Sequence, residues 1–159
     1  MPPAASGVHS TIPPRATGGN IDCKELTAGS TLYLPIQVPG GLFSVGDGHA
    51  AQGDGEISIT AIECPMDRVD LTFELRNDMP FSTPVAKTPV GWTAMGFHED
   101  LDEALVIALE AMLFLLKRLH GLERLDALAL ASVTVDFRVT QVVNGVRGVH
   151  AVLPHGAIR

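Results

Sequence analysis

The spacing of apolar side chains divides the chain near residue 100. Before that position, residues 68–75 (RVDLTFEL) alternate apolar and polar side chains, and this period predicts a half-buried strand. Less regular apolar segments, bounded by glycine or proline, predict further strands at residues 30–38, 42–45, 56–63 and 90–97. The first part of the chain is therefore expected to form mostly β-structure.

After residue 100 the apolar side chains follow a helical period as far as residue 120. Acidic residues open this segment and basic residues close it, as the helix dipole favours, and Gly121 is placed to end the helix. A second, short helix is predicted near residues 123–131. The remaining apolar segments predict a hairpin around the Asn144–Gly145 turn, with strands at residues 133–143 and 148–154.

Strands followed by helices and a terminal hairpin predict a fold of the α+β class, mainly β. We expect an antiparallel or sandwich-like sheet with one long amphipathic helix and a short second helix near the C-terminal half. The Pro- and Gly-rich residues 1–29 predict an extended lead-in, whereas residues 30–159 are expected to form a single β-rich domain.

The composition excludes several classes of partner. The 159 residues carry a formal net charge of −7 without a cluster of lysine or arginine, so neither nucleic acid nor a membrane surface is an expected partner. The longest apolar stretch, residues 104–116, is interrupted by Glu110 and is too short to span a bilayer. Cys23 and Cys64 form no disulfide framework, which together with the lack of a signal-peptide pattern predicts a reducing, cytoplasmic location.

Residues 44–56 (SVGDGHAAQGDGE) concentrate glycine and acidic residues around one histidine. Asp47 and His49 are two positions apart, so they point to the same side of an extended chain. Asp54 and Glu56 repeat this spacing. Carboxylate and imidazole groups together suit a divalent cation. Gly-Asp-Gly is also ordinary turn chemistry, so the pattern by itself admits a pair of turns as well as a binding site.

Four motifs occur in a fixed order around this segment. They are GGNxD at residues 18–22, LYLP at 32–35, GDxHxxxGDGE at 46–56 and a glutamate at position 63. In this order they resemble the acetamidase/formamidase family of amide hydrolases, and residues 135–154 resemble the C-terminal part of the same family. The resemblance implies metal-assisted hydrolysis of a short aliphatic amide, formamide or acetamide, to a carboxylate and ammonia.

The resemblance also implies roles for single residues. Asp47, His49 and Glu56 are expected to bind a divalent metal ion, zinc or calcium, with Glu56 alternatively acting as the general base. Glu63 is the second catalytic candidate. In a regular strand its odd separation from Glu56 would place the two side chains on opposite faces, a conflict that a strand beginning after Glu56 would remove.

Asn20, Asp22 and Gln52 are the residues expected to bind the amide substrate. The alternative is that Asn20 and Asp22 cap a turn and that Gln52 faces solvent. A different chemistry, a thiol amidase built from Cys23 with the lysine and glutamate that follow it, is disfavoured. Neighbouring residues of an extended chain point in opposite directions, so these three would not converge.

Members of the resembled family are usually longer than this chain and carry an N-terminal half before the GGNxD motif. The chain therefore resembles the C-terminal half of such an enzyme, and a complementary N-terminal half or a homo-oligomer is the expected partner. The alternatives are a subunit of a split amidase, an inactive truncated β-rich module for assembly or binding, and a fold stabilised by calcium.

Overall fold

The computed structural model describes residues 6–158, so residues 1–5 of the predicted lead-in and Arg159 lie outside the described residues. Within this range five strands precede two helices, and two further strands follow. The strands are β1 (Thr31–Tyr33), β2 (His49–Ala51), β3 (Ile62–Glu63), β4 (Val85–Lys87), β5 (Gly91–His98), β6 (Asp136–Gln141) and β7 (Arg147–Pro154), and the helices are α1 (Leu101–His120) and α2 (Arg124–Thr134). This is the α+β architecture that the order of patterns predicts.

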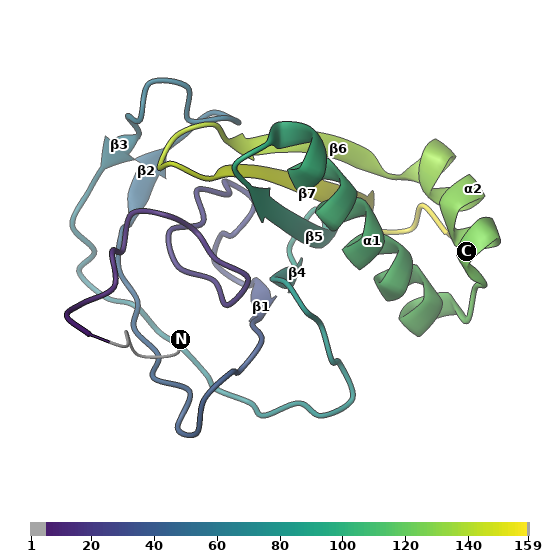
Figure 1. The fold of residues 1–159 in the computed structure, drawn as a ribbon, viewed down its shortest axis with the longest axis horizontal. Helices are drawn as coiled ribbons and strands as arrows, with labels where there is room; N and C mark the ends of the chain where they lie inside the picture. The colour runs from purple at the N-terminus through teal and green to yellow at the C-terminus, as the bar shows by residue number, and fades with distance from the viewer. Residues whose placement is uncertain (1–5, 159) are drawn as a thin grey trace.

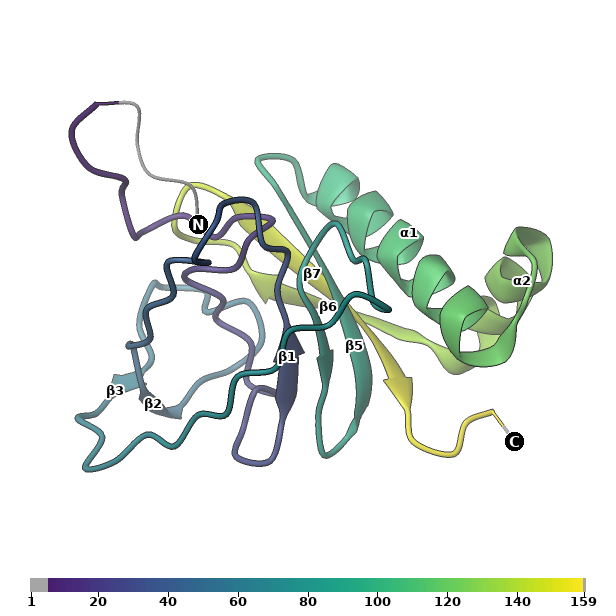
Figure 2. The same ribbon diagram turned by 90° about the horizontal axis from the view of Figure 1, so that it is seen from below.

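The main sheet of the described residues has five antiparallel strands in the order β1-β4-β5-β7-β6 (Figures 1 and 2). Its centre is the long pairing of β5 with β7, which runs in register from Gly91 opposite Pro154 to His98 opposite Arg147. β2 and β3 form a separate two-stranded sheet at the same end of the molecule as the β6–β7 turn.

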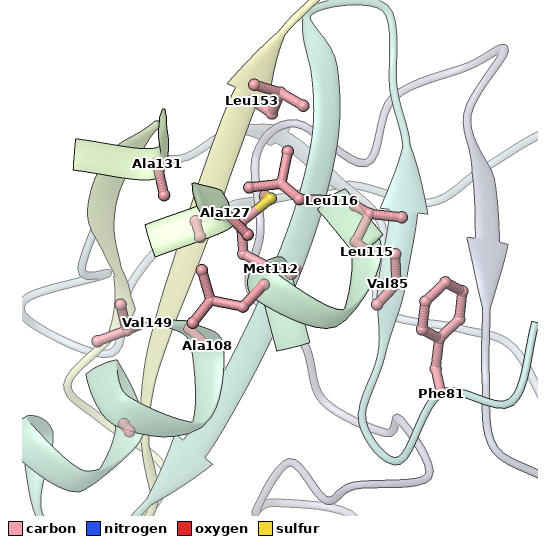
Figure 3. Close-up of a cluster of buried hydrophobic side chains, with 14 residues drawn as sticks. Phe81, Val85, Ala108, Met112, Leu115, Leu116, Ala127, Ala131, Val149 and Leu153 are labelled. Carbon is pink, nitrogen blue, oxygen red and sulfur yellow. The ribbon is translucent and has the colours of Figure 1, made fainter. Parts of the chain in front are cut away.

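Helix α1 packs across one face of the main sheet (Figure 2). The helix begins after Asp100, whose side chain accepts hydrogen bonds from the backbone N–H groups of Asp102 and Glu103, and it ends at Gly121, which has a φ of 68°. Neither helix within residues 6–158 is long and apolar enough to cross a membrane. The core shown in Figure 3 joins helix and sheet side chains, among them Val85, Ala108, Met112, Leu116, Val149 and Leu153.

Residues 21–26 cover the opposite face of the main sheet. There Cys23 packs against Ala86 and Met95 in a second, smaller apolar cluster. His150 lies directly across from Met95 in the β5–β7 pairing, and its two neighbours in β7 belong to the core under α1. Because side chains alternate along a strand, His150 points to the face that residues 21–26 cover.

The segments with the strongest local signals are confirmed. The helix expected from residue 100 to 120 spans Leu101–His120, and the second helix spans Arg124–Thr134. The terminal hairpin pairs β6 with β7, and Asn144 in its turn has a φ of 68°.

Part of the predicted β-structure is wrong. Residues 42–45 and 68–75 form no strand, and of residues 56–63 only Ile62–Glu63 does. The strand expected at residues 30–38 is shortened to β1. Residues 68–75 are exposed along their whole length, and no strand of the described chain pairs with them. A strand needs a neighbour to satisfy its backbone hydrogen bonds, and alternation alone does not provide one.

Candidate active site

The glycine-rich segment brings two of its polar side chains beside one from β3. His49 lies directly opposite Glu63 in the antiparallel β2–β3 pair, so the two side chains share one face. The imidazole Nε2 lies 3.2 Å from Asp47 Oδ1 and 3.2 Å from Glu63 Oε2. Ligand atoms of the three residues all lie within 4.8 Å of one another. We call Asp47, His49 and Glu63 the carboxylate–histidine cluster.

His49 is the most buried member of this cluster, while both carboxylates face solvent. The side chains are 14% exposed for His49, 52% for Asp47 and 64% for Glu63. Burial lowers the pKa of His49, but the hydrogen bond with Gln52 and the negative charges of the two carboxylates outweigh it and raise the pKa above its ordinary value. Two carboxylates and an imidazole at this spacing are a donor set that fits a divalent metal ion.

Gln52 connects the carboxylate–histidine cluster to buried residues behind it. Its Oε1 lies 2.9 Å from His49 Nδ1, and its Nε2 donates to the backbone carbonyl of Asp22. An amide oxygen only accepts hydrogen bonds, so the neutral imidazole carries its proton on Nδ1. The lone pair of Nε2 is then directed at the two carboxylates, as a metal-binding histidine requires.

Behind Gln52, Asp22 and Glu56 form a buried carboxyl pair. The two residues are 5% and 6% exposed, and their side chains are hydrogen-bonded to each other. Asp22 Oδ2 also accepts hydrogen bonds from Gln141 Nε2 and Asn144 Nδ2, each 2.7 Å long. Burial, together with the hydrogen bond and the negative charge of Glu56, raises the pKa of Asp22 to about 7. The carboxyl group of Asp22 can therefore gain or lose its proton near neutral pH.

Contacts with β6 hold Glu56 in place. Gly55 makes two backbone hydrogen bonds, of 3.1 and 2.9 Å, with the chain at the end of β6. Gly55 and Glu56 have φ values of 91° and 41°, so the backbone turns here and does not continue as a strand. Asp54 forms an ion pair with Lys24 at 2.8 Å. Unlike Asp47, it is therefore not a member of the carboxylate–histidine cluster.

The structure groups Asp47 and His49 with Glu63, where the sequence analysis placed Glu56 as the third ligand. Glu56 lies in the carboxyl pair instead. The odd separation of Glu56 and Glu63 causes no conflict, because β3 begins only at Ile62.

The three residues expected to bind substrate have different surroundings. Asp22 is buried in the carboxyl pair, and Gln52 is hydrogen-bonded at both ends of its amide. Asn20 donates its side-chain amide to the carbonyl of Ile12 at 3.0 Å, which is the contact of a residue that stabilises a loop.

Gln141 and Asn144 are site residues that were not predicted from the sequence. They lie 119 and 122 positions after Asp22 and meet it only through the tertiary fold. The available signal was a glutamine inside the strand expected at residues 133–143, separated by two valines from the Asn144–Gly145 turn.

This fold and site define a class of protein, an α+β domain with a carboxylate–histidine cluster beside a buried carboxyl pair. A profile of the acetamidase/formamidase family matches residues 2–156. The chain belongs to the acetamidase/formamidase family.

Curated relatives share a short, highly similar stretch with the chain. A formamidase from Methylophilus methylotrophus is 54% identical over 55 residues, which cover 35% of this chain and 13% of that protein. An acetamidase from Mycolicibacterium smegmatis is 52% identical over 48 residues, which cover 30% of this chain and 12% of the relative.

Solved structures of acetamidases match nearly the whole chain. The acetamidase of Yersinia enterocolitica superposes with a TM-score of 0.81 and 28% identity, over 99% of this chain and 47% of its own. The acetamidase of Bacillus halodurans gives a TM-score of 0.76 and 32% identity, over 91% of this chain and 48% of its own. The chain thus spans about half the length of these relatives.

Proposed function

We propose that the chain takes part in hydrolysing a short linear amide, formamide or acetamide, to a carboxylic acid and ammonia. The observation that carries this proposal is that Gln52 bridges His49 of the carboxylate–histidine cluster and the backbone carbonyl of Asp22, whose side chain belongs to the carboxyl pair. A site for a cation thus lies next to groups that exchange protons, a combination suited to amide hydrolysis. The formamidases and acetamidases among the relatives support the choice of substrate.

Asp47, His49 and Glu63 are the residues we assign to a divalent cation. When bound there, the cation supplies Lewis acidity, which polarises an amide carbonyl and makes water a stronger nucleophile. The imidazole suits zinc and the two carboxylates suit calcium, so both ions are candidates. Gln52 keeps the ring of His49 oriented through its hydrogen bond to Nδ1.

The carboxyl pair is assigned to proton transfer. Gln141 and Asn144 both donate to Asp22 Oδ2, so this oxygen does not carry the shared proton. Glu56 in its ionised form accepts a proton from the attacking water, and the pair returns a proton to the leaving nitrogen, which departs as ammonia.

We also propose that a further protein surface completes the site. Both carboxylates of the carboxylate–histidine cluster face solvent, and exposed apolar side chains lie near them in the chain, among them Ile57, Ile59 and Ile62. The solved relatives are about twice as long as the chain. The remaining half of the family fold, or a second copy of this chain, would cover these side chains and enclose a small substrate.

A cytoplasmic location is part of the same proposal. Cys23 and Cys64 are both free thiols. Thiols without disulfide partners are typical of proteins in a reducing compartment, which supports this assignment.

Ammonia release from formamide and acetamide tests the proposed function. The chain is assayed alone and together with the complementary half of the Bacillus halodurans acetamidase, in zinc or in calcium. His49→Ala should lower turnover by about 100-fold or more, because it removes the imidazole from the cluster. His120→Ala, at the exposed end of α1, is the matched control and should leave turnover unchanged.

Two results would count against this reading. Unchanged turnover in His49→Ala would show that the carboxylate–histidine cluster is not the site. Turnover in no combination of chain, partner and metal would favour the alternative function, a β-rich subunit for assembly without its own catalysis.

A further inference from the structure

A second group of metal-ligating side chains lies between residues 21–26 and the main sheet. Cys23 is 7% exposed, Glu25 is 6% exposed and His150 is completely buried. Glu25 Oε2 lies 3.4 Å from Cys23 Sγ and 3.3 Å from His150 Nε2. One ligand atom of each residue lies within 4.8 Å of the others. A thiol, a carboxylate and an imidazole therefore converge on one buried point.

A hydrogen bond on the side of the ring away from Cys23 and Glu25 fixes the orientation of His150. Its Nδ1 lies 2.8 Å from Oγ1 of Thr140, which is itself fully buried. Its Nε2 faces Cys23 and Glu25 but has no hydrogen-bond partner within the described residues. The approach to Glu25 is within ion-pair distance and lacks the geometry of a hydrogen bond. Leaving a buried polar atom unpaired destabilises a fold, and a ligand at this point would remove that penalty.

The distances in this group match those between two ligands of one zinc ion. With Zn–O and Zn–N bonds of about 2.0 Å and a Zn–S bond of about 2.3 Å, tetrahedral ligands lie about 3.3–3.5 Å apart. The Glu25 oxygen lies 3.4 Å from the thiol sulfur and 3.3 Å from the imidazole nitrogen. The other oxygen of Glu25 accepts a hydrogen bond from Arg138 at 2.8 Å, which orients the carboxylate as outer partners of metal ligands do.

The ionisation of these groups also suits a cation. Burial raises the pKa of the Cys23 thiol, and the negative charge of Glu25 raises it further, so the sulfur keeps its proton when no cation is bound. Burial lowers the pKa of His150, so the imidazole is neutral, the form that binds metals. Binding of zinc releases the thiol proton to solvent, and the thiolate then offsets part of the charge of the ion, while the Glu25 carboxylate is shared between the ion and Arg138.

We propose that Cys23, Glu25 and His150 bind one zinc ion at a structural site separate from the carboxylate–histidine cluster. A thiolate ligand selects zinc over calcium and magnesium. Asp22 directly precedes Cys23, so the ion fixes the segment that carries Asp22 of the carboxyl pair onto the main sheet. This site does not depend on the proposed function, because it orders the chain whether or not the chain turns over an amide.

Cobalt(II) is the probe for the test, because thiolate-bound cobalt absorbs strongly in the near ultraviolet through charge transfer. Metal-free chain is titrated with cobalt and then with zinc. We expect the band to appear in the wild-type chain and to disappear when zinc displaces cobalt. In His49→Ala, which disables the other cluster, the band should persist and be complete at one equivalent. Cys23→Ser should abolish the band, and His150→Gln should weaken cobalt binding by about 10-fold or more.

Cys64→Ser is the matched control, since the chain has only two cysteines. Its band should equal that of the wild type, and this assigns the thiolate to Cys23 even where Cys23→Ser fails to fold. Zinc should also raise the melting temperature of the wild-type chain and of Cys64→Ser. Absence of the band in the wild-type chain, or its loss in Cys64→Ser, overturns the proposal.

Discussion

Two acids of the candidate site have strained backbones. Asp47 and Glu56 have φ values of 64° and 41°, in the left-handed region that residues other than glycine rarely adopt. This conformation costs on the order of 1–2 kcal/mol per residue and persists where surrounding contacts fix it. The side chain of Asp47 contacts His49 and that of Glu56 contacts Asp22, so the strained residues are those to which the proposed function assigns metal binding and proton transfer.

Glu63 and Glu56 are expected to respond differently when their charge is removed. Glu63→Gln takes a carboxylate from the carboxylate–histidine cluster, so affinity for the divalent ion should fall about 10-fold or more. Glu56→Gln leaves that cluster intact, so it should retain the ion while turnover with the complementary half falls about 100-fold or more. Calorimetric titration with zinc and calcium, followed by ammonia release from the same preparations, separates the two roles.

Glu103→Gln provides the control for both measurements, because Glu103 lies exposed in the first turn of α1. It should change neither metal affinity nor turnover. The opposite pattern, in which Glu56→Gln loses the ion and Glu63→Gln keeps it, would make Glu56 the third ligand, as the sequence analysis expected.

Among the secondary-structure elements, the packing of α1 on the main sheet depends on a close approach to β5. A Cβ atom on Gly96 would lie 2.1 Å from the carbonyl oxygen of Ala104 and 2.5 Å from the amide nitrogen of Ala108, both backbone atoms of α1. Gly96→Ala must therefore displace the helix. The expected loss in free energy of unfolding is about 1–3 kcal/mol, measured by urea denaturation.

Gly46→Ala is the matched control for this substitution. A Cβ atom at Gly46 would meet nothing within 4 Å, so its effect should stay within about 0.5 kcal/mol. Equal losses at both positions would mean that the cost comes from replacing glycine and not from the contact between α1 and β5.

The helices and the terminal hairpin were predictable from the sequence because their signals are local. α1 carries its apolar period within its own length, and its N-cap Asp100 and C-cap Gly121 directly flank it. The Asn144–Gly145 turn joins two strands that are neighbours in the sequence. Residues 68–75 alternate apolar and polar side chains just as clearly, but no strand of the described chain pairs with them. A strand forms only where a neighbouring strand is present, so the alternation alone was not sufficient.

The same distinction applies to the candidate site. Asp47 and His49 are two positions apart, so spacing suffices to group them. Glu63 joins them through the register of β2 and β3, and Gln141 reaches Asp22 across 119 positions. Register and tertiary contact depend on how the whole chain pairs, which local spacing does not reveal.

Across the whole molecule, residues 57–75 expose an apolar surface that a folded protein normally covers. The side chains left in solvent include Ile57 at 77% exposure, Phe73 at 69% and Leu75 at 72%. Residues 68–75 alternate like a strand, are exposed, and pair with no strand of the described chain. Their unpaired backbone groups and apolar side chains can therefore bind another polypeptide. Since the solved relatives are about twice as long, we expect the remaining half of the family fold to occupy this edge.

Leu71→Glu tests this surface, because Leu71 belongs to the apolar side of residues 68–75 and is 49% exposed. The free energy of unfolding of the chain alone should change by less than about 1 kcal/mol, since the side chain already contacts solvent. Association with the complementary half of the Bacillus halodurans acetamidase should weaken by about 10-fold or more, because the charge would be buried against an apolar partner. Analytical ultracentrifugation measures the association.

Thr72→Glu adds the same charge on the opposite side of the segment, where an alternating pattern places polar groups, and should weaken association much less. Equal weakening by both variants would show that net charge, and not the apolar face, governs binding. The chain alone could instead form dimers that Leu71→Glu dissociates and Thr72→Glu leaves intact. In that case the partner is a second copy of this chain. The two carboxylates of the carboxylate–histidine cluster would then face that neighbouring copy.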